Sequence, residues 1–181
     1  MRHACKTTAA AFAAALALAA GFLSVRAQAP APDPWAPLRF LAGTWEGSGS
    51  GKPGEVISGS CTFAFELEGR ILVRTNRAEY APKAGEKAKT VHEDRLIVYH
   101  DPGTVAFSAI YFDNEGHTIH YAVSVPAAGK AVFESAAHEG APRFRLTHEL
   151  LSDGTLATEF AMAPPGGPFQ TYTRGITKKT K

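Results

Sequence analysis

The stretch from Leu38 to Gly51 reads LRFLAGTWEGSGSG, and it decides how the rest of the chain is interpreted. Its first half places apolar residues at helical spacing, and its second half alternates glycine with other residues along a strand. Glycine within a strand permits a sharp bend, or the close approach of a ligand or a neighbouring strand. We therefore predict a short helical turn followed by a glycine-rich strand.

Downstream of this stretch, apolar residues alternate along short segments that are separated by turn signals. The predicted strands are residues 44–51, 56–67, 71–80, 91–99, 105–111, 119–125, 131–136, 144–150, 156–162 and 169–176. About ten strands with almost no helix indicate an all-β sandwich or an antiparallel up-and-down barrel. Closure is favoured because it removes exposed sheet edges. The helical turn before the first strand would then plug one end of the barrel.

The N-terminal 27 residues have the pattern of a secretory signal peptide. A short basic region precedes a charge-free apolar run of about 15 residues, which is shorter than the roughly 20 that a bilayer requires. We expect an exported protein, periplasmic or extracellular, whose mature chain does not insert stably into a membrane. The alternative is an uncleaved anchor. Residues 28–34 form a Pro- and Ala-rich linker, in which Asp33 caps a helix that starts at Pro34, and residues 35–178 form the barrel domain.

Net charge limits the kinds of molecule that the protein is expected to bind, and the cysteine count limits its disulfide bonds. The whole chain has 19 Lys and Arg against 17 Asp and Glu, but three of the basic residues belong to the predicted signal peptide. The mature chain is therefore slightly acidic, which argues against a nucleic-acid partner. Cys61 is the one cysteine left after cleavage, so an internal disulfide is excluded, and we expect a packed thiol.

Two groups of polar residues stand out along the predicted strands. His148 shares a strand face with Phe144 and Leu146, so it is either a hydrogen-bonded core histidine or a group that lines a ligand cavity. His92 and Asp94 share one strand face, and Glu93 and Arg95 share the other. We expect one of these two pairs to point inward near a barrel mouth and the other to be solvated. The four remaining histidines of the mature chain are predicted to lie at the surface: His100, His117, His120 and His138.

The sequence contains no complete catalytic constellation. A general-base mechanism would need His92 paired with Asp94 and a nucleophile opposite, and no nucleophile elbow is present. Nucleotide-binding loops, zinc spacings and calcium loops are also missing from the sequence. We therefore assign no catalytic residue and do not expect an enzyme.

Two stretches resemble one known family. The pattern L-x-F-L-x-G-x-W-x-G-x-G-x-G of residues 38–51 resembles the N-terminal signature of the nitrobindin-like β-barrels. The segment MAPPGGPFQTY of residues 162–172 resembles the C-terminal hairpin of the same family. These barrels belong to the fatty-acid-binding-protein-like and lipocalin-like (calycin) group, and the chain also resembles secreted bacterial barrels of this type.

The resemblance implies a heme-binding or lipid-binding interior. Nitrobindins ligate heme iron through a histidine on the last strand, and that position falls on Tyr172 here, whose tyrosinate is a possible iron ligand. If Tyr172 points inward, strand alternation places Gln170 and Arg174 inside as well, where Arg174 would hold a tyrosinate or a ligand carboxylate. The alternative is that these side chains face solvent while Phe169 and the threonines between them face inward.

These observations favour an exported barrel that holds a small hydrophobic or amphipathic ligand, either heme or a carboxylate-bearing lipid. The expected lining residues are Tyr172, Arg174 and His148, with Trp45 at the plugged end. Two other classes stay open: a heme-dependent or cofactor-free barrel enzyme, and a structural or envelope-interaction module with a filled core.

Overall fold

A computed structural model of the chain describes residues 32–52, 54–101 and 103–180. The predicted signal peptide and most of the predicted linker lie outside these residues. From Asp33 onward the chain forms one compact unit, and the description below is of that unit.

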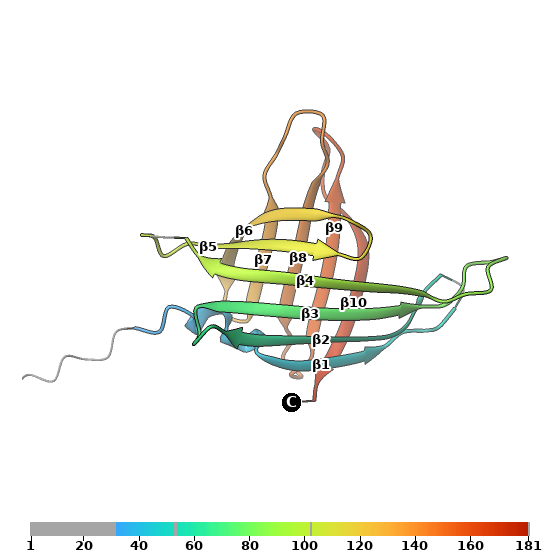
Figure 1. Ribbon diagram of the computed structural model, residues 1–181, viewed down its shortest axis with the longest axis horizontal. Helices are drawn as coiled ribbons and strands as arrows, with labels where there is room; N and C mark the ends of the chain where they lie inside the picture. The colour runs from blue at the N-terminus through green and yellow to red at the C-terminus, as the bar shows by residue number, and fades with distance from the viewer. Residues whose placement is uncertain (1–31, 53, 102, 181) are drawn as a thin grey trace, which may run out of the picture. The chain divides into compact units, whose positions relative to one another are not determined.

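Within the described residues, ten strands and one short helix alternate with turns (Figure 1). All neighbouring strands are antiparallel, and the order β1-β10-β9-β8-β7-β6-β5-β4-β3-β2 closes a barrel. This confirms the predicted all-β, up-and-down barrel of ten strands. The helix is η1 (Ala36–Leu41), and the strands are β1 (Gly43–Ser48), β2 (Val56–Glu66), β3 (Ile71–Tyr80), β4 (Thr90–His100), β5 (Phe107–Asp113), β6 (Thr118–Ala127), β7 (Lys130–Ser135), β8 (Arg143–Leu150), β9 (Leu156–Ala163) and β10 (Gln170–Lys179).

The predicted helical plug is a 3₁₀ helix. The Asp33 carboxylate accepts a hydrogen bond from the backbone N–H of Trp35 at 3.0 Å, and Pro34 lies in the turn that follows. The helix therefore starts two residues later than predicted, at Ala36. Leu38 and Leu41 are fully buried, so the plug contributes apolar side chains to one end of the barrel.

The glycines of β1 are required by close packing. A Cβ atom at Gly47 would lie 2.6 Å from the carbonyl oxygen of Ile176, and one at Gly49 would collide with the carbonyl of Val56. No side chain fits at these distances, so β10 and β2 can approach β1 only where β1 has glycine. The regular strand ends at Ser48, three residues earlier than predicted, and β1 pairs with β10 only through Trp45 and Glu46.

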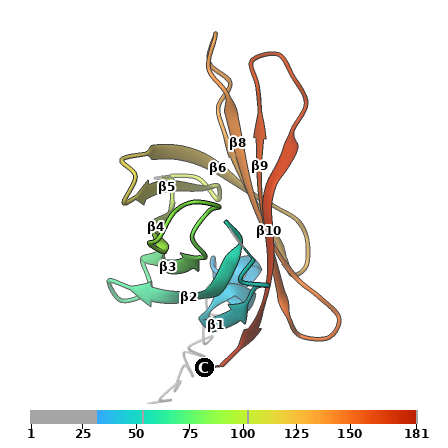
Figure 2. The same ribbon diagram turned by 90° about the vertical axis from the view of Figure 1, so that its right-hand side faces the viewer.

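The interior is packed at the end that η1 covers. Buried residues from η1 and most strands form one apolar cluster there: Trp35, Leu38, Leu41, Trp45, Cys61, Phe63, Leu72, Leu96, Val98, Phe107, Ala109, Tyr121, Ala131, Phe133, Leu146 and Leu156. At the other end, the β7–β8 and β9–β10 hairpins extend beyond the remaining strands (Figure 2). Most of β10 is exposed along this stretch.

Two apolar residues depart from the predicted alternation. Val105 precedes β5 and is 93% exposed, because the strand begins only at Phe107. Leu67 follows β2 in a left-handed conformation with φ 51° and is also exposed. Both residues belong to turns, where the twofold pattern of a strand no longer decides which face a side chain occupies.

Candidate ligand-binding site

Asp94 on β4 is the centre of a polar cluster on the inner wall of the barrel. Its carboxylate accepts hydrogen bonds from Arg74 Nη1 at 2.7 Å and from Asn76 Nδ2 at 2.8 Å, both from β3. Arg74 and Asp94 are both buried. Burial by itself raises the pKa of Asp94, but the Arg74 cation and the hydrogen bonds from His92 and Asn76 outweigh it and hold the pKa below its usual value. The pair is therefore ionised and mutually compensated.

His92 connects this cluster to the barrel mouth. Its Nε2 lies 3.3 Å from Asp94 Oδ2 and 3.1 Å from the Tyr111 hydroxyl, and its Nδ1 lies 2.9 Å from Glu115 Oε1. The hydrogen bond to Asp94 is the main reason why the pKa of His92 rises to about 9; burial opposes the rise, and Glu115 adds to it. His92 is therefore a cation held between two acids, and neither nitrogen is free to act as a base.

The structure confirms that one polar pair of β4 faces inward. His92 and Asp94 belong to the inner wall, whereas Glu93 and Arg95 face outward. Glu93 accepts a hydrogen bond from Arg77 at 2.6 Å, and Arg95 donates to the Thr75 hydroxyl at 2.9 Å. Both outward contacts are exposed, so they contribute little compared with the buried pair.

His148 lies inside the barrel, as predicted, but within the packed half. It is fully buried, its Nδ1 lies 2.9 Å from the Thr158 hydroxyl, and its ring packs edge-on against Phe63 and Phe133. Burial lowers its pKa well below the usual value, and the nearby Arg74 cation adds to this effect, so the imidazole is neutral. His148 is a core histidine in this arrangement and does not line open space.

Trp45 is also part of the packed half. Its indole nitrogen donates a hydrogen bond to the Leu41 carbonyl at 2.7 Å, and only 1% of the residue is exposed. The predicted position at the plugged end is therefore correct. This contact ties the first strand to η1.

The last strand does not keep the alternation that was predicted for it. A bulge between Thr171 and Thr173 shifts the register of β10 against β9. Tyr172 is 77% exposed and packs edge-on against Phe160 of the inner wall, and Gln170 pairs with Met162. Arg174 pairs with Glu159 instead, and it faces outward. Tyr172 and Arg174 therefore do not share a face, because one extra residue in a strand reverses the pattern beyond it.

Two glycines of the inner face have open space in front of them. Gly175 pairs with Thr158, whose hydroxyl contacts His148, so Gly175 belongs to the inner face. A Cβ atom at Gly175 would meet nothing within 4 Å, and one at Gly59 would meet only the Arg77 carbonyl oxygen, at 3.9 Å. The inner wall therefore borders open space at these glycines.

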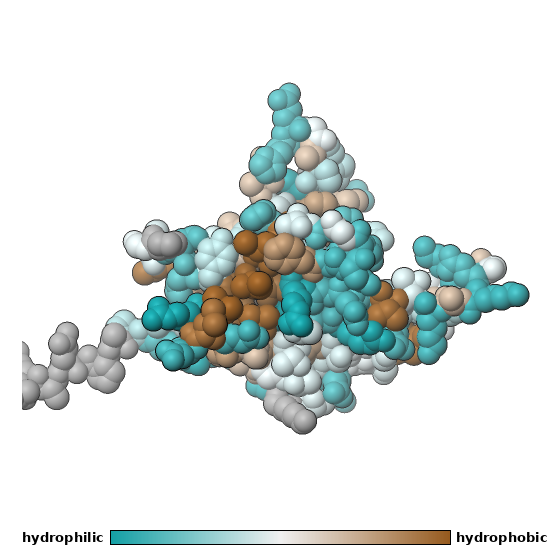
Figure 3. All heavy atoms as spheres, in the orientation of Figure 1, coloured by the Kyte–Doolittle hydropathy of each residue, from teal (hydrophilic) through white to brown (hydrophobic). Residues whose placement is uncertain are grey.

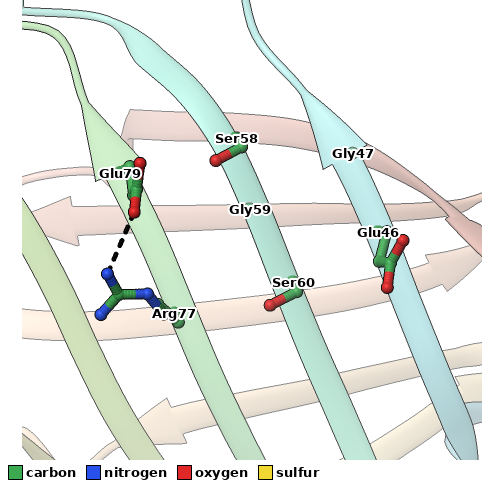
Figure 4. A pocket seen from close by; sticks show the side chains of 7 residues that line it. All are labelled: Glu46, Gly47, Ser58, Gly59, Ser60, Arg77 and Glu79. Carbon is green, nitrogen blue, oxygen red and sulfur yellow. Dashed lines mark hydrogen bonds and ion pairs between the residues drawn. The ribbon is translucent and has the colours of Figure 1, made fainter.

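Two shallow grooves lie on the outer face. One, of about 210 Å³, crosses β1, β2 and β3 (Figure 4). The other, of about 450 Å³, crosses β7 to β10 and is lined by Lys130, Val132, Arg145, Thr147, Glu149, Ala157, Glu159 and Arg174. Arg174 thus contributes to an outer groove and not to the interior for which it was predicted.

The burial of the remaining histidines and of Cys61 can also be compared with the predictions from the sequence. His117, His120 and His138 are exposed, as predicted. His100 is an exception, because its ring packs 4.1 Å from that of Phe107 and its Nε2 is buried without a partner. Cys61 is a buried thiol, as predicted, and burial raises its pKa.

Sequence reasoning missed four of the six residues of the polar cluster. Arg74, Asn76, Tyr111 and Glu115 were not singled out. Alternation along β3 would have been a usable signal, because Leu72, Arg74 and Asn76 share a face, and a charge beside a core leucine indicates a buried ion pair. Glu115 belongs to the turn after β5, and no periodic pattern predicts its contact with His92.

Comparison with known proteins assigns no family. No protein-family model matches the chain, and a search of curated proteins also finds no match. Among the described residues, no helix is long and apolar enough to cross a membrane. In the same part of the chain, no cluster of three or more His, Cys, Asp and Glu side chains is arranged to hold a metal ion. Fold and site together define a small β-barrel that is packed at one end and polar inside.

Proposed function

We propose that the protein is an exported barrel that binds a small amphipathic ligand in its open half. One observation carries the proposal: the inner wall combines a half-buried cationic imidazole, His92, with open space at Gly59 and Gly175. A barrel filled only for stability would place apolar side chains at such positions. Export is part of the proposal and rests on the sequence of residues 1–27.

A carboxylate-bearing apolar molecule fits this arrangement best. Arg74 is compensated by the buried Asp94, whereas the Nδ1 of His92 is held only by Glu115, whose side chain is 54% exposed and which a ligand carboxylate would replace. The Nδ1–H of the imidazolium would then donate a hydrogen bond to the carboxylate head group. The apolar part of the ligand would lie against Phe144, Phe160 and Tyr172, whose rings pack against one another. This assignment agrees with the resemblance to fatty-acid-binding barrels.

The residues around Tyr172 do not fit a tyrosinate-ligated heme. Such a site needs a positive charge beside the phenolate, and Arg174, the residue predicted to provide it, faces away from Tyr172. His148 is enclosed by Phe63 and Phe133 and offers no accessible nitrogen as a substitute. The lipid-like ligand is therefore favoured over heme.

A fluorescence titration with a fluorescent fatty acid tests the proposal. We expect saturable binding to the purified protein, at least tenfold weaker in His92→Gln, which removes the cation, and in Gly175→Leu, which fills the space. Glu93→Gln is the matched control, because Glu93 is the outward neighbour of His92 on the same strand. Absence of saturable binding, or equal binding by all variants, would contradict the proposal.

A second titration separates heme from the lipid-like ligand. Hemin is added to the wild-type protein and to Tyr172→Phe, and the Soret band is recorded. We expect no Soret band that saturates at one heme per chain. A saturating band that changes in Tyr172→Phe would replace the lipid assignment with a heme site.

A further inference from the structure

The outer face of the barrel carries a row of apolar residues where a polar surface is expected. Ala64, Val73, Ile97 and Ile110 lie directly opposite one another across β2, β3, β4 and β5. Their neighbours in sequence, Arg74, Leu96 and Ala109 among them, are buried on the inner wall, so alternation turns this row outward. Within the row Ala64 is exposed and Ile97 and Ile110 are half-buried, whereas Val73 at its centre is only 6% exposed.

Further apolar side chains extend the row into a patch. Figure 3 shows apolar surface gathered in front of β3, β4 and β5, with hydrophilic residues around it. Phe112 is 43% exposed. The outer apolar patch consists of Ala64, Ile71, Val73, Ile97, Tyr99, Ile110 and Phe112.

The rest of the outer face is polar by comparison. The groove over β1, β2 and β3 is lined by Glu46, Ser58, Ser60 and Arg77 among others, and the groove over β7 to β10 carries three basic and two acidic side chains. Apolar side chains gathered in one place on the outside of a barrel indicate a surface that another molecule covers.

Charges at the margins of the patch indicate what covers it. Arg95 pairs with Thr75, two residues after Val73, and Glu66 pairs with Ile71, two residues before it. Arg95 and Glu66 are thus placed symmetrically about Val73, one strand to either side. Neither side chain makes an ion pair with any other residue in the described part of the chain.

A face-to-face dimer can use these two opposite charges. If two copies pack face to face about a twofold axis at Val73, Arg95 of each copy meets Glu66 of the other, and the apolar row is buried between them. An anionic membrane surface would instead require a basic margin, and the margin here contains both Glu66 and Glu93.

We infer that the outer apolar patch is a self-association surface, occupied by a second copy of this chain. This inference does not depend on the proposed ligand, because the patch and the open space lie on opposite faces of the wall. The interface would leave the inner wall and its polar cluster unchanged in both copies.

Sedimentation of the purified protein over a concentration series tests the inference. We expect a reversible dimer, with a dissociation constant at least tenfold weaker in Arg95→Glu and in Glu66→Arg, because each variant places like charges together. The double variant, which exchanges the two charges, should dimerise as the wild type does. Arg174→Glu is the matched control, since it reverses an outward charge on the opposite wall.

A further variant and a vesicle assay distinguish self-association from binding to a membrane. Ile97→Lys should yield a monomer that still unfolds cooperatively in urea, which shows that it is folded. A wild-type protein that stays monomeric up to about 100 µM overturns the inference, as does a dimer that no patch variant weakens. Flotation of the monomer with anionic phospholipid vesicles would assign the patch to a membrane instead.

Discussion

The two faces of one wall, formed by β3, β4 and β5, each carry residues that a simple apolar-inside, polar-outside pattern does not predict. Inside, Arg74 and Asp94 form a buried ion pair; outside, Val73 and Ile97 form an apolar row. Val73 and Arg74 are neighbours in sequence, so the chain inverts polarity between adjacent residues. A buried ion pair within an apolar interior and an apolar row on the outer face both cost stability in a monomer. The difference indicates that each face has a binding role: a ligand inside and a second protein surface outside.

The largest expected effect comes from breaking the inner ion pair. Arg74→Met leaves the Asp94 carboxylate buried without its cation, which should lower the free energy of unfolding by about 3–5 kcal/mol. Urea denaturation measures this difference. Arg77→Met, on the outer face of the same strand, should cost far less, because the ion pairs of Arg77 with Glu79 and Glu93 are exposed. Equal losses in the two variants would show that the inner pair has no special role.

A smaller effect follows from the titration of His92. Its pKa is about 9 in the folded protein, above the usual value near 6.5 for an unfolded chain. The folded state therefore binds the proton more tightly, and the resulting stability, about 2 kcal/mol, is fully present below pH 6.5 and is lost as pH rises through about 9.

The measurement is the free energy of unfolding of wild type and His92→Gln, each at pH 6 and at pH 10. We expect a gap between the two proteins at pH 6 that narrows at pH 10. His120→Gln is the control, because His120 is exposed on the outer face. A gap of constant size would contradict the ion-pairing of His92 with Asp94 and Glu115.

Two glycines of the inner face, Gly47 and Gly59, should differ in how much stability a substitution by alanine costs. Gly47→Ala brings a Cβ atom to 2.6 Å from the Ile176 carbonyl oxygen, which should cost about 1–3 kcal/mol. Gly59→Ala, on the paired strand, meets only a carbonyl at 3.9 Å and should change stability by less than about 1 kcal/mol. Thermal unfolding of the two variants compares them, and a reversed order would remove the case for open space at Gly59.

The smallest effect on stability is expected for Phe112, on the outer face of the barrel. Phe112 is 43% exposed, so Phe112→Ser should change the free energy of unfolding by only about 0.5 kcal/mol. The same variant should nevertheless weaken self-association, because it removes apolar area from the outer apolar patch. Chemical denaturation and sedimentation on one sample separate the two effects. A large loss of stability without any change in association would identify Phe112 as a packing residue alone.

Part of the candidate site could be predicted from the sequence, because strand alternation acts locally. The shared face of His92 and Asp94 and the inward direction of His148 both follow from a repeat of two residues. The same rule failed for Tyr172 and Arg174, because a single bulged residue in β10 reversed the faces beyond it. Bulges arise from how two strands fit each other, and they leave no periodic signal in either strand.

The sequence by itself determined the all-β class, the approximate positions of the ten strands and of the turns between them, and the helical segment that precedes β1. These features follow from local periodicity, from glycine and proline in turns, and from the spacing of apolar residues. Only the tertiary structure decided that Arg74 of β3 meets Asp94 of β4, that Glu115 reaches His92, and that Arg95 and Glu66 flank Val73. Such pairings depend on strand register and barrel closure, which bring together residues that no short stretch of sequence relates.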